Sequence, residues 1–233
     1  MTTNIRTSVE PVYPKWQSKN KLEEYKAFVS DLKVAASIVM KRLGKNFQFV
    51  IDDNNRQIIL QLFYYITNDK RFLGNHNKGI FLSGNIGTGK TILLMSFLEV
   101  MKVHTGKNYF VTYPETVHAV YREKRLDFFK LRPLLIDDIC REPEKVEGYW
   151  QSESPVKLIT QYRYNFACQN YCTGNFGIYS NKVNADGKRN LKEKIVDGKL
   201  IPDNEIVKRY GLMIFDRMWE MYNFLELKGD TRR

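Results

Sequence analysis

A glycine-rich run in this chain has the residue types and spacing needed to bind phosphate. Residues Gly84 to Thr91 follow the Walker A pattern G-x-x-x-x-G-K-T, in which backbone N–H groups and a helix N-terminus face phosphate oxygens. Lys90 is expected to reach the β- and γ-phosphates, and the Thr91 hydroxyl to bind Mg²⁺. The predicted cofactor-binding residues are Gly84, Asn85, Ile86, Gly87, Thr88, Gly89, Lys90 and Thr91.

The residues on either side of the loop supply the context that such a site requires. Ile80 to Leu82 form a short apolar run, which is typical of a buried strand. Apolar residues then recur at helical spacing after Thr91, and Gly106 is a suitable helix end. This strand–loop–helix context favours a nucleotide site over a chance glycine turn.

A second apolar run ends in paired acids. Leu134 to Ile136 are followed directly by Asp137 and Asp138, and open α/β sheets bind their ligands at the carboxyl ends of strands. By themselves, two acids at the end of a strand could simply lie at the surface. Downstream of a Walker A loop, we interpret this run as a Walker B strand. Asp137 would hold Mg²⁺ through water, and Asp138 would polarise the attacking water.

The spacing of apolar residues predicts an α/β protein with a parallel sheet, because predicted strands alternate with helices. The expected strands comprise residues 80–82, 109–112, 133–136, 176–179 and 224–227. The expected helices comprise residues 22–43, 53–66, 92–105, 116–130, 154–166, 204–210 and 212–222. Residues 182–202 are polar and lysine-rich, and form an apparent insertion.

The composition is that of an ordinary globular protein of 233 residues, with 43% hydrophobic and 27% charged residues. The net charge of +11 suggests a polyanionic partner, most simply nucleic acid, although charge alone does not establish one. No signal peptide or membrane-spanning run is evident, so a cytoplasmic location is expected. Three cysteines without a disulfide framework are interpreted as reduced thiols.

These motifs together resemble the AAA+ ATPases of the DnaC and IstB type, which include bacterial and phage helicase loaders and the ATPase subunits of some transposons. The resemblance covers residues 54–233 and implies a P-loop NTPase of the AAA+ type, with a parallel sheet flanked by helices, a small N-terminal helical segment and a truncated lid. The residues that carry it are the Walker A loop, Leu135-Ile136-Asp137-Asp138-Ile139, Arg141-Glu142-Pro143, Tyr210-Gly211, Phe215-Asp216-Arg217-Met218 and Leu227 to Arg232.

The resemblance also implies roles for three further residues. Asn181, after the predicted fourth strand, would be the sensor 1 residue that orients the hydrolytic water. Arg217 would be the arginine finger for a neighbouring subunit's nucleotide, and Arg232 the sensor 2 residue in its own subunit. A helix-face salt bridge and a frayed terminus are the alternative interpretations of these two arginines. The predicted cofactors are ATP and Mg²⁺, with Thr91 and Asp137 at the metal; the predicted catalytic residues are Lys90, Asp137, Asp138, Asn181, Arg217 and Arg232.

Two departures from the family pattern stand out. Asp138 replaces the glutamate that is more usual in AAA+ proteins, although members of this family also carry a second aspartate, and the shorter side chain allows slow hydrolysis. The insertion at residues 182–202 has no role that the resemblance explains.

Two stretches are candidates for binding nucleic acid. The first lies where the loaders carry a helix that binds single-stranded DNA, and an ordinary amphipathic helix explains it equally well; its residues are Tyr121, Arg122, Lys124, Arg125 and Lys130. The second is weaker, and we interpret it as a solvated loop; its residues are Lys188, Arg189, Lys192 and Lys194.

The resemblance therefore implies an ATP-dependent helicase loader that binds single-stranded DNA and a replicative helicase, and that self-associates through its ATP site. Residues 1–50 would form an arm and a helical partner-binding segment, and residues 51–233 the AAA+ domain. One alternative is an IstB-like ATPase that recruits a transposase to DNA. Two others are a small-molecule kinase, for which no arginine-rich lid is found, and a nucleotide-binding scaffold that hydrolyses little.

Overall fold

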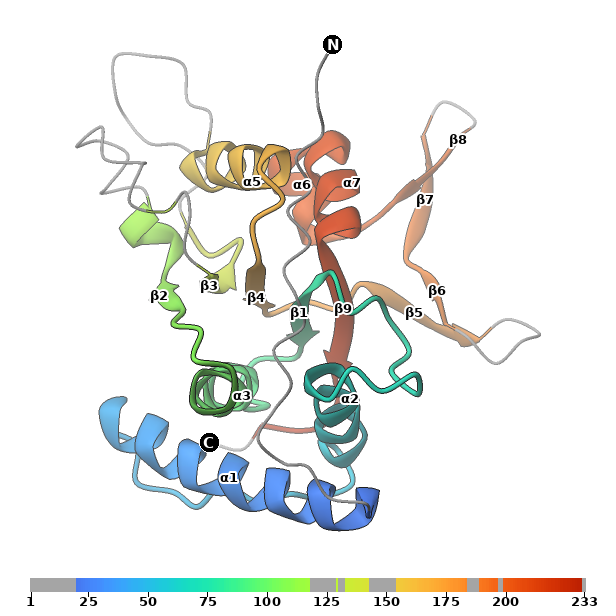
Figure 1. The fold of residues 1–233 in the computed structure, drawn as a ribbon. Coiled ribbons are helices and arrows are strands. Elements are labelled where there is room, and N and C mark those ends of the chain that lie inside the picture. The colour runs from blue at the N-terminus through green and yellow to red at the C-terminus, as the bar shows by residue number, and fades with distance from the viewer. Residues whose placement is uncertain are drawn as a thin grey trace.

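A five-stranded parallel sheet forms the centre of the protein. The computed structural model describes residues 20–117, 129, 133–142, 154–183, 189–196 and 199–231 (Figure 1). The strand order is β2-β3-β4-β1-β9, and every neighbouring pair is parallel, which confirms the predicted α/β class. The bounds of these strands are Gly79–Gly84 for β1, Phe110–Thr112 for β2, Leu134–Ile139 for β3, Asn170–Gly174 for β4 and Tyr222–Leu227 for β9.

Alternate residues of each strand face two separate hydrophobic cores, as expected for a sheet covered on both sides. Ile80 and Leu82 of β1 belong to one core, and Phe81 between them belongs to the other. The first core is covered by α1 (Lys21–Arg42), α2 (Arg56–Ile66) and α3 (Lys90–Thr105). The second is covered by α5 (Pro155–Asn165), α6 (Glu205–Tyr210) and α7 (Leu212–Met221), on the opposite side in Figure 1.

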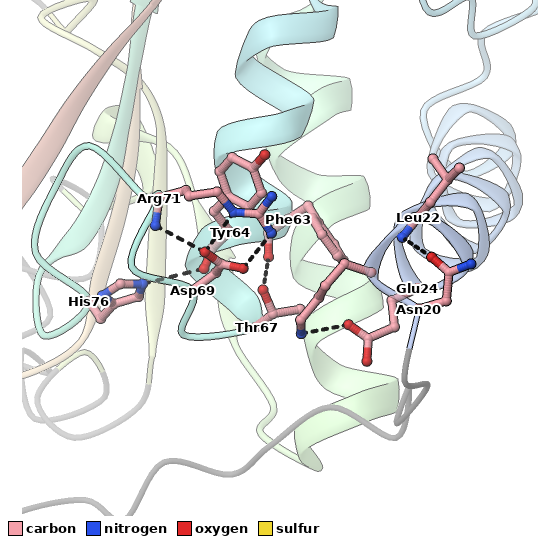
Figure 2. Close-up of polar contacts among 10 residues, drawn as sticks. Asn20, Leu22, Glu24, Phe63, Tyr64, Thr67, Asp69, Arg71 and His76 are labelled. Carbon is pink, nitrogen blue, oxygen red and sulfur yellow. Dashed lines mark hydrogen bonds and ion pairs between the residues drawn. The ribbon is translucent and has the colours of Figure 1, made fainter.

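The helix end predicted at Gly106 is confirmed, and a second glycine follows α1. Gly106 has φ 70° and donates its N–H to the carbonyl oxygen of Lys102 at the end of α3. Gly44, two residues after α1, has φ 63°. At the start of α1 the Asn20 side chain accepts the N–H of Leu22 at 3.0 Å (Figure 2), which satisfies a donor that the helix itself cannot pair. None of the helices in the described ranges is long and apolar enough to cross a membrane.

Helix α1 packs directly on the rest of the protein. Phe28 and Leu32 are fully buried in the same core as α3, and Arg42 forms an ion pair with Glu99 of α3. The predicted boundary at residue 50 therefore falls within one continuous core. The partner-binding role of residues 1–50 stays a prediction.

The prediction of the fourth strand was wrong. The parallel strand is β4 at Asn170–Gly174, which lies between β3 and β1, whereas residues 176–179 lead out of the sheet. The run from Tyr171 to Thr173 is short and mixed in polarity, while the following run from Phe176 to Tyr179 is more apolar. Sequence pattern alone favoured the second run, but burial from both sides selects the first.

Helix α5 buries an arginine. Arg163 is 1% exposed, whereas the aromatic Phe166, directly after the helix, is 58% exposed. The Arg163 guanidinium donates to the carbonyl oxygens of Phe129 and Gln169 and to the side chain of Asn170. A buried arginine is tolerated here because its donors are satisfied by backbone oxygens at the sheet end.

The predicted polar insertion forms two antiparallel ribbons that stand away from the sheet (Figure 1). The first pairs β5 (Tyr179–Val183) with β6 (Arg189–Leu191), and the second pairs β7 (Glu193–Val196) with β8 (Lys199–Pro202). The chain then enters α6.

A polar cluster holds the connection between α2 and β1 (Figure 2). The Arg71 guanidinium donates to both carboxylate oxygens of Asp69, at 2.9 and 2.7 Å, and lies over the Tyr64 ring at 4.4 Å. This bidentate pairing lowers the pKa of Asp69 to about 2. Because the folded-state pKa lies below the unfolded value, the ionised group stabilises the fold above about pH 4, and this contribution is lost as the pH falls towards 2.

We expect Asp69→Asn to lower the free energy of unfolding at neutral pH by less than ~1 kcal/mol, since Arg71 is half exposed. The deficit should shrink at about pH 3, where the native Asp69 also begins to lose its charge advantage. Urea unfolding at the two pH values measures both effects. Asp53→Asn is the matched control, because both side chains of the Asp53–Arg56 ion pair are exposed. If both variants lost the same free energy of unfolding at both pH values, the stabilising role of the Asp69–Arg71 pair would be contradicted.

Candidate functional site

The glycine-rich loop between β1 and α3 is closed on its outer side by the C-terminal segment. Gly84 has φ 140°, and a Cβ there would lie 2.1 Å from the carbonyl oxygen of Leu227. Gly87 has φ 83°, and a Cβ there would lie 2.3 Å from Oγ1 of Thr231. Both positions therefore require glycine, for backbone conformation and for space.

Lys90 is the first residue of α3 and is 4% exposed. Its Nζ donates to the carbonyl oxygens of Gly84 at 3.0 Å and Asn85 at 2.6 Å. The ammonium group is thus held within the loop, at the helix N-terminus, where two positive contributions meet. This arrangement fits the phosphate groups of a nucleotide.

The Asp137 carboxylate connects the loop to the sheet. Its Oδ1 accepts the hydroxyl of Thr91 at 2.8 Å and that of Thr173 at 2.7 Å. Thr173 lies on β4, between the strands that carry the loop and the carboxylate. Burial raises the pKa of Asp137, an effect that the hydroxyl groups of Thr173 and Thr91 partly offset. A buried carboxylate of this kind is stabilised by a cation.

The donors at this point fit Mg²⁺. Among the described residues, no three His, Cys, Asp or Glu side chains cluster closely enough to hold a metal by themselves. Mg²⁺ is usually held by one or two carboxylates together with water and substrate phosphates, and Thr91 and Asp137 supply that protein share. When bound, the ion neutralises phosphate charge.

Asp138 adopts a left-handed conformation, with φ 62°. Its N–H donates to Thr173 Oγ1 at 2.7 Å, and its carboxylate accepts the side-chain amide of Asn175 and, at 3.4 Å, the guanidinium of Arg141. The carboxylate therefore lies at the carboxyl edge of the sheet. A side chain so placed is available to a water at the phosphate end of a nucleotide.

Asn175 takes the position that the sequence analysis gave to Asn181. Asn175 follows β4 directly and contacts Asp138. Asn181 instead lies in β5, outside the parallel sheet. The earlier assignment depended on the wrong fourth strand. The sequence signal that was missed is Thr173-Gly174-Asn175 at the end of a short strand; Thr173 was missed for the same reason.

Arg217 is not brought to the loop of its own chain. It lies on α7, which covers the core on the opposite side of the sheet from α3. α7 leads into β9 beside Gly79, at the far end of β1 from the loop. Its guanidinium lies 5.4 Å over the Tyr164 ring. Its Nη1 is buried and has no hydrogen-bond partner within the described residues. The salt-bridge interpretation thus finds no support in the described part of the chain.

The Glu142 and Tyr210 positions of the family pattern meet in space. The Tyr210 hydroxyl donates to the Glu142 carboxylate and accepts the N–H of Cys140 at 3.2 Å. Both side chains are almost fully buried. Burial is the main cause of a raised pKa at Tyr210, with Cys140 and Glu142 adding to it. This contact attaches the segment after the Walker B strand to α6.

Seven of the predicted residues lie outside the described part of the chain: Tyr121, Arg122, Lys124, Arg125, Lys130, Lys188 and Arg232. The neighbour of Arg232, Thr231, packs against Gly87. In the second basic stretch, Arg189 lies in β6, and Lys192 and Lys194 are exposed.

The sheet order and the loop between β1 and α3 together have the α/β P-loop fold of the AAA+ type. No family model matches the chain. In sequence it is similar to the replicative helicase loader DnaI of Bacillus subtilis (strain 168), with 27% identity over 183 residues, covering 72% of this chain and 56% of that protein. The chain thus spans little more than half the length of this curated relative.

Three solved structures share the fold, each with a TM-score of 0.51. A DnaC helicase loader is 16% identical and is matched over 77% of this chain and 93% of its own. DnaI is 21% identical, over 79% and 87%. A primosome component of Streptococcus pyogenes serotype M3, itself described as putative, is 18% identical, over 79% and 85%. The resemblance to DnaC-like AAA+ loaders that the motifs indicated is confirmed.

We expect Asp137→Asn to raise the melting temperature of the nucleotide-free protein. Asparagine keeps the oxygen that accepts the Thr91 and Thr173 hydroxyls but removes a buried charge whose pKa is raised. The gain should diminish as the pH is lowered, because the native carboxyl then becomes neutral. Mg²⁺-dependent nucleotide affinity should fall about tenfold, or ~1.4 kcal/mol. Thermal melts with and without Mg²⁺ and ATP, with exposed Asp53→Asn as control, test this; a lower melting temperature would contradict it.

We expect Asn175→Ala to reduce ATP turnover about 10²-fold while nucleotide affinity changes little, because an oriented amide acts mainly on the transition state. Asn181→Ala should leave turnover near the native value. Steady-state turnover and fluorescent-nucleotide titration separate the two effects. The reverse pattern would restore Asn181 as the sensor residue.

Proposed function

We propose that the protein is an ATP-binding and ATP-hydrolysing helicase loader that acts in DNA replication. The observation that carries the proposal is the hydrogen bond from Thr91 to Asp137, in a chain similar to a replicative helicase loader. This bond joins the residue after Lys90 to a carboxylate on β3, and so supports a shared site for nucleotide and metal. The likeness to DnaI supports the loader role and favours it over recruitment of a transposase.

In this proposal each polar group at the loop has a distinct task. Lys90 binds the β- and γ-phosphates, and Thr91 and Asp137 hold Mg²⁺. Asp138 and Asn175, which are hydrogen bonded to one another, orient and polarise the attacking water. Turnover is slow because aspartate at position 138 reaches less far than glutamate.

The site is completed by a second copy of the chain. Arg217 lies on the face of the sheet away from its own loop, so it serves a neighbour's γ-phosphate; an arginine in that role is worth roughly 10³–10⁵ in rate. Arg232, one residue beyond Thr231 at the loop, contacts the γ-phosphate in its own subunit. ATP therefore controls self-association.

The partners follow from the same assignment. Residues 1–50 contact a replicative helicase, while the positively charged body, with a net charge of +11, binds single-stranded DNA. The stretch from Tyr121 to Lys130 supplies aromatic and basic contacts to that strand. ATP hydrolysis then releases the assembled contacts.

ATP turnover with and without single-stranded DNA tests this function, using Lys90→Ala and Arg217→Ala. Lys90→Ala should lose nucleotide binding, whereas Arg217→Ala should bind nucleotide but turn over at least about 10³-fold more slowly. Mixing the two variants should restore part of the activity, because Lys90→Ala still offers Arg217 to a neighbour that binds ATP. Pull-down of a replicative helicase, compared with a transposase, tests the partner.

Lys70→Gln is a control for loss of surface charge, since Lys70 is exposed. Native turnover in Lys90→Ala would refute the ATP site. Absence of recovery in the mixture would refute the shared site while leaving nucleotide binding intact. Phosphorylation of a small acceptor, without any response to DNA, would instead identify a kinase.

A further inference from the structure

Arg217 is held between α7, which carries it, and the neighbouring helix α5. The two helices pack side by side on the second core (Figure 1). The guanidinium carbon of Arg217 lies 5.4 Å from the centre of the Tyr164 ring of α5. A guanidinium over an aromatic ring at this distance is attracted to it. The ring therefore restricts the directions in which this long side chain can point.

The same tyrosine also holds a carboxylate. Its hydroxyl donates to Oε2 of Glu220 at 2.7 Å, and this hydrogen bond is the main cause of a raised pKa at Tyr164. Glu220 lies three residues after Arg217 on α7, a spacing at which opposite charges commonly pair. Within the described residues Glu220 accepts the tyrosine instead, and Nη1 of Arg217 has no hydrogen-bond partner. The Tyr164 hydroxyl thus competes with Arg217 for this carboxylate.

Arg217 can still meet a second molecule from this position. Met213, four residues before it on α7, is 53% exposed, and Glu220, three residues after it, is exposed as well. Residues at these spacings share one face of a helix. Arg217 itself is half-buried. One part of its side chain is therefore open to a neighbour while the Tyr164 ring supports another.

A restrained arginine suits a task in which direction matters. A free arginine side chain gives up rotamer freedom whenever it is fixed, and contact with the ring removes part of that cost before a neighbour arrives. An arginine that stabilises phosphoryl transfer must lie close to the charge that develops in the transition state. Loss of the restraint should therefore lower turnover rather than nucleotide affinity.

We propose that Tyr164 and Glu220 position Arg217 for the γ-phosphate of a second copy of the chain. The ring of Tyr164 sets the direction of the guanidinium, and its hydroxyl keeps Glu220 from neutralising it. Tyr164 acts only through Arg217, so it is a positioning residue and not a catalytic one. The inference rests on the role proposed above for Arg217 and adds the residues that make this arginine effective.

Steady-state ATP turnover of the full chain, with kcat and KM measured separately, tests the inference. Tyr164→Ala should lower kcat roughly tenfold, as expected for loss of a cation–π contact, while KM for ATP changes less than about twofold. Tyr164→Phe keeps the ring but frees Glu220, and should lower kcat about threefold. Tyr164→Phe/Glu220→Gln should return kcat close to native, because a neutral glutamine does not pair with the arginine.

Tyr162→Ala is the matched control. Tyr162 lies on the same helix, but its ring stacks on Phe166 rather than on Arg217. Its kcat should stay close to native. Adding Tyr164→Ala to Arg217→Ala should cause no further loss of turnover, since the tyrosine acts through the arginine that is already absent.

Mixtures of variants separate a positioning defect from a folding defect. Tyr164→Ala binds ATP but offers a poorly directed arginine, whereas Lys90→Ala offers a native one. Their mixture should recover part of the native turnover. A mixture of Tyr164→Ala with Arg217→Ala should not recover, because neither copy supplies a well-directed arginine. Thermal melts of each variant accompany these measurements.

An unchanged or raised kcat in Tyr164→Ala, together with a defective Arg217→Ala, would overturn the positioning role alone. Native turnover in Arg217→Ala would overturn the role of that arginine at a neighbouring site, and this inference with it. A loss in Tyr164→Ala that the Lys90→Ala copy does not restore would also overturn the inference, because the tyrosine would then serve the fold of its own chain.

Discussion

The position of one buried carboxylate constrains the arrangement of the whole site. Asp137 is 5% exposed and accepts hydroxyl groups from Thr91 and Thr173 on the same oxygen. Burying an ionised group is unfavourable unless hydrogen bonds and opposite charge compensate, and the nearby Lys90 lowers the pKa that burial raises. The nucleotide-free fold therefore buries a negative charge that a metal ion would neutralise. This burial lowers the stability of the nucleotide-free fold and favours cation binding.

That contact exists only if the sheet has its observed strand order. β4 lies between β1 and β3, so Thr173 reaches Asp137 on one side while Thr91 reaches it from the start of α3. The same edge gathers Asp138 and Asn175, because parallel strands end on the same side. Residues 227–231 then return to the loop and pack against Gly84 and Gly87. The site therefore combines segments from most of the chain.

The glycine-rich loop and Arg217 are carried by helices on opposite faces of the sheet. α3 and the loop belong to one face, and α7 with Arg217 to the other. The outer ribbon, β7 with β8, carries exposed lysine and aliphatic side chains away from both cores. The loop that fits a nucleotide and the exposed surfaces of α7 and the ribbons are therefore carried by different parts of the fold.

The sequence by itself determined the features that depend on neighbours along the chain. The spacing from Gly84 to Thr91 indicated the loop, Asp137 and Asp138 followed from an apolar strand, and Gly106 marked the end of α3. Only the tertiary structure decided which short run is β4, that Asn175 rather than Asn181 follows it and contacts Asp138, and that Arg163 is buried. These outcomes depend on strand pairing and on burial from both sides, which join residues distant in sequence. Local periodicity carries no information about such partners, so a run as short and mixed as Tyr171 to Thr173 gains its identity from the strands beside it.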